Sequence, residues 1–429
     1  MEMKFKDSGI EWIGRIPETW EVTKLNTLYT QRIEKVSDKD YPPLSVTMQG
    51  ILPQLENAAK TNNGDDRKLV RVGDFAINSR SDRRGSCGIS PYEGSVSLIN
   101  TILKPRNEMN PRYYNWLFHS SLFSDEFYKW GHGIVDDLWT TRWQEMRNIT
   151  VPSPTMEVQQ RIADYLDEKC GEIDLLMGLQ VQMIEKLKAY KLSVITEAVT
   201  KGLNPNAKLV PSGIDWIEEI PEGWTIKPFK ELFRTGKGLS FTKADLVKEG
   251  VPVISYGQVH SKQNTGTSII DELIRYVPEE IAKTGLSSKV NVGDFIFADT
   301  SEDLSGCGNC VYVDKEVGLY AGYHSVIAFS KRHLSNLYLA YLFLTDCWRS
   351  QIRSRVSGIK VFSISQTIIN QTSIMLPPED EQQSITAYLD EKCADIDRLI
   401  DLKQQKIEKL KYYKKSVIYE AVTGKTIIE

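Results

Sequence analysis

The stretch QQRIADYLDEKCGEIDLLMGLQVQMIEKLKAYKLSVITEAVT, from Gln159 to Thr200, decides the fold because a second copy of it follows later in the chain. That copy, QQSITAYLDEKCADIDRLIDLKQQKIEKLKYYKKSVIYEAVT, begins at Gln382, and roughly two positions in three are identical. A shorter motif, SGIEWIGRIPETW at 8–20, returns as SGIDWIEEIPEGW at 212–224. Two repeated segments in the same order predict an internal duplication.

Both copies of the long segment have the pattern of an amphipathic helix, with apolar residues at spacings of three and four. These residues are Leu166, Ile173, Leu176, Met177, Ile184, Leu187, Val194, Ile195 and Ala198 in the first copy, and Leu389, Ile396, Leu399, Ile400, Ile407, Leu410, Val417, Ile418 and Ala421 in the second. At a rise of 1.5 Å per residue, such a helix is on the order of 60 Å long, which is typical of a spacer. Pairing the two helices as a coiled coil would bury both apolar faces.

Two blocks that resemble each other only faintly, Glu21–Thr150 and Thr225–Ile374, lie between the repeated segments. Val-Gly-Asp-Phe at 72–75 in the first block matches the same four residues at 292–295 in the second. Short β-like runs alternate with helical stretches such as 113–130 and 338–350, so we predict two mixed α/β domains with one fold.

The predicted organisation is an α+β chain in six segments with a pseudo-twofold internal symmetry. In order they are an N-terminal motif (1–20), a first variable domain (21–150), a central helical spacer (151–203), a second copy of the motif (204–224), a second variable domain (225–374) and a C-terminal helical spacer (375–429).

The composition is ordinary for a globular protein, with 41% hydrophobic and 26% charged residues among 429. No apolar run approaches the roughly 20 residues that span a bilayer, and the N-terminus lacks the apolar region of a secretory signal. We therefore expect a cytoplasmic protein whose six cysteines are reduced thiols. The net charge of -4 counts against nucleic-acid binding, unless basic residues cluster in space or partner subunits supply phosphate contacts.

Motifs of common enzyme classes are absent from the sequence. It has no glycine-rich phosphate loop, no dinucleotide fingerprint and no amino-methyltransferase tetrapeptide. Asp390-Glu391-Lys392 resembles the end of a nuclease motif, but its repetition at 167–169 favours a solvated helix face or a partner contact. Cys307 and Cys310, with His324 or His333, have the composition of a zinc site, yet a lone Cys-x-x-Cys is more typical of a turn with buried thiols. We predict no catalytic residue, no metal and no cofactor in this chain.

Taken together, these motifs resemble the specificity subunits of type I restriction-modification systems. The resemblance covers nearly the whole chain and includes the paired openings, the Gly-Asp-Phe step, the Pro-Pro-x-x-x-Gln-Gln helix entry and the Glu-Ala-Val-Thr ending. It implies that each variable block is a target-recognition domain that reads one half of an asymmetric bipartite site in double-stranded DNA. It further implies that the helices pair antiparallel, fix the spacing and dock two modification (methyltransferase) subunits, to which restriction subunits are added. S-adenosylmethionine, ATP and magnesium would then belong to the partner subunits.

Base reading needs donors and acceptors on protruding loops, with Arg or Lys suited to guanine and Asn or Gln suited to adenine. Candidates in the first block lie in a basic turn and in an aromatic cluster that also contains Trp130, His132 and Trp143. The predicted DNA-binding residues are Asn78, Ser79, Arg80, Arg83, Arg84, Trp139 and Arg142 in the first block, and Tyr256, Gln258, His260, Lys262, Gln263, Arg353, Arg355 and Lys360 in the second.

For partner binding, we select Leu187 and Tyr190 on the first helix and Leu410 and Tyr413 on the second, because repeated helix faces suit two copies of one partner. Two other functions stay open at this point. One is a stand-alone sequence-specific DNA-binding regulator, which would bind its site tightly without a methyltransferase. The other is a nuclease or metalloenzyme that uses Cys307, Cys310 and Asp390, which metal analysis and a cleavage assay would reveal.

Overall fold

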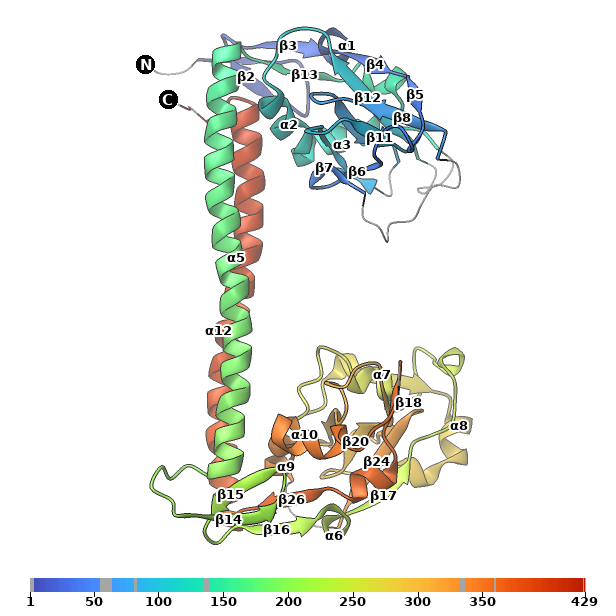
Figure 1. Ribbon diagram of the computed structural model, residues 1–429, viewed down its shortest axis with the longest axis vertical. Coiled ribbons are helices and arrows are strands. Elements are labelled where there is room, and N and C mark those ends of the chain that lie inside the picture. Colours follow the sequence, from blue (N-terminus) through green and yellow to red (C-terminus); the bar gives the residue numbers. More distant parts are fainter. Residues whose placement is uncertain are drawn as a thin grey trace. The chain divides into compact units, whose positions relative to one another are not determined.

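The computed structural model describes residues 4–54, 64–80, 83–133, 139–331, 336–358, 360–426 and 428. Contacts between Cα atoms divide the chain into two compact units. Unit 1 comprises Met1–Gln182 and Lys403–Glu429, and unit 2 comprises Met183–Leu402. Each unit therefore contains one globular domain and a segment of each of two long helices (Figure 1).

The long helices are α5 (Met156–Lys201, 46 residues) and α12 (Glu379–Val422, 44 residues), where the repeated segments predicted them. Both begin just after a proline whose carbonyl oxygen accepts a hydrogen bond from a glutamine side chain: Gln159 to Pro154 and Gln382 to Pro377, each at 2.8 Å. Both end before a glycine with positive φ, Gly202 (+73°) and Gly424 (+71°), where a side chain would be strained.

The helix segments also pair in the same way within each unit. In unit 1, the Lys414 ammonium donates to Asp174 at 2.7 Å, and in unit 2, the Lys191 ammonium donates to Asp397 at 2.7 Å. Buried positions on both helices follow spacings of four and three, as in a heptad repeat. Those on α5 include Leu166, Cys170, Ile173, Gln180 and Ile184, and those on α12 include Leu389, Cys393, Ile396 and Ile407.

The domain of unit 1 is built on a four-stranded antiparallel sheet with the order β10-β9-β12-β4. These strands are Cys87–Ile89, Phe75–Asn78, Asn100–Pro105 and Tyr29–Arg32. Smaller sheets are β11-β8-β5 (Gly94–Val96, Arg67–Val70, Lys35–Val36), β6-β7 (Leu44–Thr47, Gly50–Pro53), β13-β3 (Thr150–Ser153, Glu21–Lys24) and β1-β2 (Phe5–Asp7, Arg15–Pro17). Its helices are α1 (Leu25–Leu28), α2 (Pro111–His119), α3 (Ser121–Lys129) and α4 (Trp143–Met146).

The domain of unit 2 has the corresponding sheet, in the order β22-β20-β24-β17. These strands are Cys310–Tyr312, Phe295–Ala298, Ser325–Ser330 and Phe233–Lys237. Smaller sheets are β19-β18-β23 (Arg275–Val277, Val251–Ile254, Tyr320–Ala321), β16-β26 (Thr225–Pro228, Ser373–Leu376), β14-β15 (Leu209–Ile214, Ile217–Pro221) and β21-β25 (Thr300–Ser301, Phe362–Ser363). Its helices are α6 (Phe229–Leu232), α7 (Tyr256–Val259), α8 (Glu279–Thr284), α9 (Leu337–Leu344), α10 (Asp346–Arg353) and α11 (Gln366–Asn370), with 3-10 turns at Lys243–Asp245, Asp271–Leu273 and Leu286–Ser288.

The repeated Val-Gly-Asp-Phe step forms the same turn in both domains. Gly73 (φ +87°) and Gly293 (φ +98°) adopt a backbone conformation that favours glycine. The aspartate that follows accepts a hydrogen bond from the backbone N–H three residues before it, at 2.9 Å for Asp74 and 2.8 Å for Asp294. The phenylalanine then begins the buried strand, which explains three of the four repeated residues.

The repeated Trp motif packs against the end of a long helix in each unit. In unit 1, Trp12, Ile16 and Trp20 share a core with Val417 and Ile418 of α12. In unit 2, Ile220 and Trp224 share a core with Ile195, Ala198 and Val199 of α5. The motif therefore connects the apolar residues at the end of the long helix with the apolar core of the domain.

The structure breaks each predicted helical stretch, 113–130 and 338–350, into two helices. Ser120 ends α2 and caps α3, where its hydroxyl accepts from the Phe123 N–H at 3.3 Å. Thr345 ends α9 and caps α10 by accepting from the Trp348 N–H at 3.4 Å. A serine or threonine that bonds the backbone in this way competes with helix continuation.

The six cysteines are free, and five of them are buried. No helix in the described part of the chain is long and apolar enough to cross a membrane.

Candidate nucleic-acid interface

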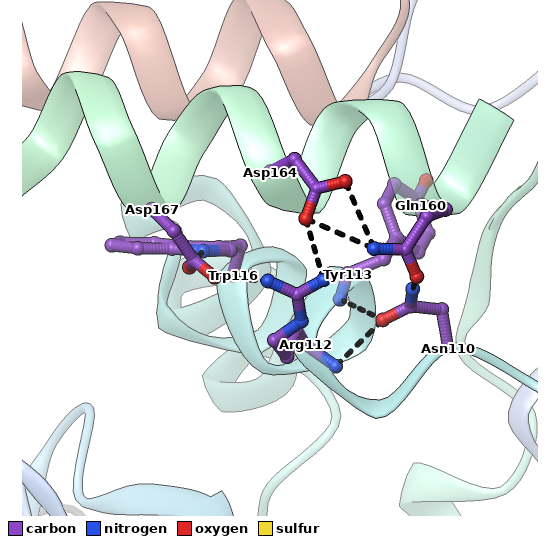
Figure 2. A network of polar contacts seen from close by, with 7 residues as sticks. All are labelled: Asn110, Arg112, Tyr113, Trp116, Gln160, Asp164 and Asp167. Atoms are coloured by element: carbon purple, nitrogen blue, oxygen red, sulfur yellow. Dashed lines mark hydrogen bonds and ion pairs between the residues drawn. The ribbon is translucent and has the colours of Figure 1, made fainter.

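The domain of unit 1 is attached to α5 by the N-terminal turn of α2 (Figure 2). The Asn110 side chain caps α2 by accepting from the backbone N–H of Arg112 at 2.9 Å, and it donates to Gln160 at 2.7 Å. The Arg112 guanidinium bonds both Asp164 and Asp167 on α5, each at 2.6 Å. Hydrogen bonds from Gln160 and Arg112 hold the pKa of Asp164 below its usual value.

Two further bonds of this attachment have counterparts in unit 2. The Tyr113 hydroxyl donates to the backbone oxygen of Val422 at 3.0 Å, and the Tyr338 hydroxyl donates to that of Val199 at 2.9 Å. In the same way, Trp116 Nε1 donates to Asp167 at 2.7 Å, and the Tyr341 hydroxyl donates to Asp390 at 2.6 Å. Each domain is thus held by the start of one long helix and the end of the other.

The acidic residues of the Asp-Glu-Lys repeat lie at exposed helix positions, as the interpretation as a solvated helix face predicts, and the aspartates have an additional contact. Asp167 and Asp390 accept hydrogen bonds from the chain's own domains. Burial and the Asp390 carboxylate raise the pKa of the Tyr341 phenol, so the proton stays on tyrosine. The sequence could not reveal this role because the donors lie far away in the chain.

The basic turn and the aromatic cluster of unit 1, predicted as separate candidates, form one surface in the structure. The Tyr128 hydroxyl donates to the Arg80 carbonyl at 3.0 Å, and the Thr141 N–H donates to the Ser79 carbonyl at 3.0 Å. Trp139 Nε1 donates to the Tyr128 carbonyl at 3.0 Å, close against Gly131, where a Cβ would clash with the Trp139 ring. Ser81 and Asp82 of the turn lie outside the described residues.

The candidate residues on this surface differ in their surroundings. Asn78 and Ser79 are buried and hold the turn: Asn78 accepts from the Arg80 N–H at 3.0 Å, and Ser79 bonds Thr101 at 3.0 Å. Arg84 is paired with Asp125 and lies over the Tyr128 ring at 4.8 Å. Arg80, Arg83 and Arg142 are exposed.

In unit 2, the predicted residues 256–263 lie on and after the short helix α7. Gln258 accepts from the backbone N–H of Ser255 at 3.1 Å, so it caps this helix. His260 Nε2 lies 2.8 Å from the Thr300 carbonyl oxygen, and Asn309 Nδ2 lies 3.1 Å from His260 Nδ1. Because the Asn309 amide donates to Nδ1, we assign the His260 proton to Nε2. Lys262 and Gln263 are exposed.

The other predicted basic residues of unit 2 lie at the end of α10 (Arg353) or after it (Arg355 and Lys360). Arg353 pairs with Asp346 at 2.7 Å and donates to the Ser305 carbonyl at 2.8 Å. Arg355 is exposed and donates to the Gln351 carbonyl, and Lys360 is exposed.

Tyr256, His260 and Arg353 line one cleft of about 910 Å³ in unit 2. Other residues of its lining, which were not predicted to bind DNA, include Thr300, Glu302, Asp303, Asn309, His324 and Arg349. His324 has a positive φ of 54°, which is uncommon for a residue with a side chain, and it bonds Asp299 at 3.2 Å. The acidic segment 299–303 was not predicted, because carboxylates are repelled by DNA phosphates and the base-reading rule was applied to Arg, Lys, Asn and Gln.

The zinc interpretation of Cys307 and Cys310 finds no support. Both thiols are buried, and burial raises the pKa of Cys310 to about 12, which disfavours the thiolate that binds zinc. No group of three metal-binding side chains occurs among the described residues. His333 lies outside them, and His324 bonds Asp299 instead.

Of the predicted partner-binding residues, Tyr190 and Tyr413 are 59% and 50% exposed. Leu187 and Leu410 are half-buried at heptad positions, so they belong to the helix pair at least in part. Exposed apolar residues on the same helices include Leu175, Leu179, Leu399, Leu402 and Tyr412.

Comparisons with known proteins agree with this architecture. Residues 221–412 match the family model of the type I restriction modification DNA specificity domain. The type I restriction enzyme MjaVIII specificity subunit of Methanocaldococcus jannaschii is 24% identical, over 96% of this chain and 94% of that protein. This chain is similar to the type I specificity subunits.

Solved structures share the fold of this chain. A chain from a structure on complex assembly and conformational transition of the type I R-M system aligns with a TM-score of 0.70 at 14% identity, covering 96% of this chain and 99% of that one. The HsdS subunit from Thermoanaerobacter tengcongensis aligns with a TM-score of 0.51 at 15% identity, covering 96% and 98%.

Proposed function

We propose that this chain is the DNA-recognition subunit of a type I restriction-modification complex. Each domain reads one half of a split sequence in double-stranded DNA. The observation that carries this proposal is that two domains with the same sheet order and equivalent attachments to the helices have different surfaces. A frame that repeats while its surfaces differ suits a protein that reads two unlike half-sites.

The proposed role of the helices is to form an antiparallel coiled coil that sets the distance between half-sites. The heptad spacing of buried residues and the equivalent ion pairs Asp174–Lys414 and Lys191–Asp397 support it. In this pseudo-twofold arrangement, one reading head would belong to residues 21–150 and the other to residues 225–374. Half-sites read on one face of DNA lie about one helical turn, roughly 34 Å, apart or a multiple of it.

The proposed partners are two modification subunits and the restriction subunits that join them. Tyr190 and Tyr413 support this, because both are large, exposed and repeated at matching positions of the two helices. Methyl transfer and DNA cleavage, with their S-adenosylmethionine, ATP and magnesium, would then occur in those subunits in the cytoplasm. This chain supplies sequence recognition and carries out no chemistry.

The test is an exchange of one domain in the assembled enzyme. Replacing residues 21–153 with the corresponding block of a relative keeps β3 and β13 together, since Glu21 pairs with Ser153. Co-expression with the modification subunits and sequencing of methylated DNA should show a change in one half-site only. A matched exchange of 225–376, which keeps β16 with β26, should change only the other half. A change in both halves after either exchange, or tight specific binding without any methyltransferase, would contradict the proposal.

A further inference from the structure

One loop occupies the same place in both domains but carries opposite charge. In unit 1, the described residues 79–80 and 83–86 lie between β9 and the edge strand β10. In unit 2, residues 299–309, which include the two-residue strand β21, lie between β20 and the edge strand β22. We name these segments the first and the second edge loop. The first has Arg80, Arg83 and Arg84, with one aspartate, Asp82, outside the described residues, whereas the second has Asp299, Glu302 and Asp303.

The backbone of the first edge loop is fixed around Arg80. The Arg80 N–H donates to Asn78 at 3.0 Å, its carbonyl accepts from Tyr128 at 3.0 Å, and Arg80 forms a β-bridge with Thr140. Arg84 is occupied by Asp125 and Tyr128. Within the described residues, the Arg80 guanidinium forms neither an ion pair nor a hydrogen bond. It is therefore an available donor on a positioned backbone.

The second edge loop is held by three segments from outside it. His260 bonds the Thr300 carbonyl at 2.8 Å, Arg353 donates to the Ser305 carbonyl at 2.8 Å, and the Ile364 N–H donates to the Asp299 carbonyl at 2.7 Å. Such external bonds fix the loop before any ligand arrives, which is what a specific site requires.

The carboxylates of the second edge loop are not equivalent. Asp299 bonds His324 at 3.2 Å, and Asp303 accepts from the Ser305 hydroxyl at 2.6 Å and from the Gly306 N–H at 2.7 Å. Glu302 lines the cleft, is exposed and has no bonded partner in the described part of the chain. Glu302 therefore shares two properties with Arg80 of the first edge loop: it is exposed, and its charged group has no partner among the described residues.

We propose that Arg80 and Glu302 read bases of opposite hydrogen-bonding character in the two half-sites. Arg80 donates to O6 and N7 of a guanine, and Glu302 accepts from the N4 amino group of a cytosine. This inference rests on the proposed function and adds the identity of one base pair in each half. A carboxylate near DNA is repelled by the phosphates, so an unpaired glutamate at this position weakens binding unless it bonds a base donor.

The experiment uses the chain assembled with its modification subunits. Methylated sites are sequenced, and binding is measured on DNA duplexes with single base-pair changes, for the variants Arg80→Ala and Glu302→Gln. Each variant should lose about 10- to 100-fold of the discrimination at one base pair of its own half-site. That base pair should be G·C for both, and the other half-site should be unchanged, which also shows that the variant is folded.

The change in DNA affinity caused by Glu302→Gln distinguishes a glutamate that contacts a base from one that only repels the phosphates. If Glu302 only repels phosphates, its neutralisation strengthens binding to all sequences alike, and specificity stays the same; this result overturns the inference. Glu316→Gln is the matched control, because it removes the same charge from an exposed residue outside the residues that line the cleft. For Arg80→Ala, an equal loss on all sequences with a weaker salt dependence would show a phosphate contact and likewise overturn it.

The proposed function can fail separately from this inference. An assembled enzyme that methylates no split sequence refutes the proposed function and the inference together. An enzyme that methylates a split sequence, but whose variants keep full discrimination at every base pair, refutes the base assignments alone.

Discussion

The attachments of the two domains to the long helices use the same buried bonds but different surroundings. Tyr113 and Tyr338 make the same contact with the end of a helix. Around it, unit 1 has the exposed network of Arg112, Asp164 and Asp167, whereas unit 2 has Leu337 in place of Arg112 on α9, a helix of sequence LYLAYLFL. The two copies share the buried tyrosine bonds and differ in the exposed ion pairs of Arg112, as expected if exposed ion pairs contribute little.

The largest effect should come from the shared aromatic core. The Phe118 and Phe123 rings are tilted against each other with their centroids 4.8 Å apart. The counterpart of Phe118 is Phe343, whose ring centroid lies 4.1 Å from that of Trp348. Both phenylalanines are buried. Phe118→Ala and Phe343→Ala should each lower the free energy of unfolding of their own unit by about 3–5 kcal/mol. Hydrogen exchange followed by peptide can check this, and equal loss of protection in both units after either change would contradict it.

The buried tyrosine bonds should give a smaller and equal effect. Tyr113→Phe and Tyr338→Phe should each cost about 1 kcal/mol, because each leaves a backbone carbonyl without its donor. Burial raises the pKa of both phenols well above the usual value. Both bonds should therefore persist at neutral pH, and the stability that the buried phenols contribute should fall as the pH rises above about 10, where the unfolded tyrosine ionises. Denaturant titrations of the two variants would measure both losses of unfolding free energy. Unequal losses would show that the two tyrosine contacts are not equivalent.

The exposed network of unit 1 should have the smallest effect. Arg112→Leu introduces the residue that unit 2 has at this position, so the loss should be smaller than for either tyrosine variant and should fade at high salt. The pKa of Asp164 is lowered in the folded chain by Gln160 and Arg112. Its contribution is therefore present above about pH 4 and lost as the pH falls through the lowered value. Stability measured against salt and pH checks this, and a salt-independent loss as large as that of Tyr113→Phe would contradict it.

The sequence was sufficient for the parts of the fold that repeat. Residues 159–200 and 382–423 predicted both long helices because their apolar spacing is a local property. The two-helix form of 113–130 was missed, although Ser120 was visible as a capping residue. Here the local hydrogen bond of a serine outweighs the helical pattern on both sides of it.

The candidate site was predicted less completely, because it depends on contacts between distant segments. Gln258 has a side chain suited to adenine, yet it caps α7. Arg80 and Arg84 are indistinguishable in sequence, and only the position of Asp125 separates the occupied guanidinium from the available one. Glu302 was missed because an acidic residue counts against DNA binding until its place in the sheet is known.

The packing of the Trp motif on α12 also determines the order in which the two domains can fold during synthesis on the ribosome. All the segments of unit 2 lie between residues 183 and 402, so its core can close as soon as that stretch has emerged. The core of unit 1 includes Trp12 and Trp20, which precede unit 2 in the chain, together with Val417 and Val422, which follow it. The domain whose synthesis begins first is therefore the one whose folding is completed last.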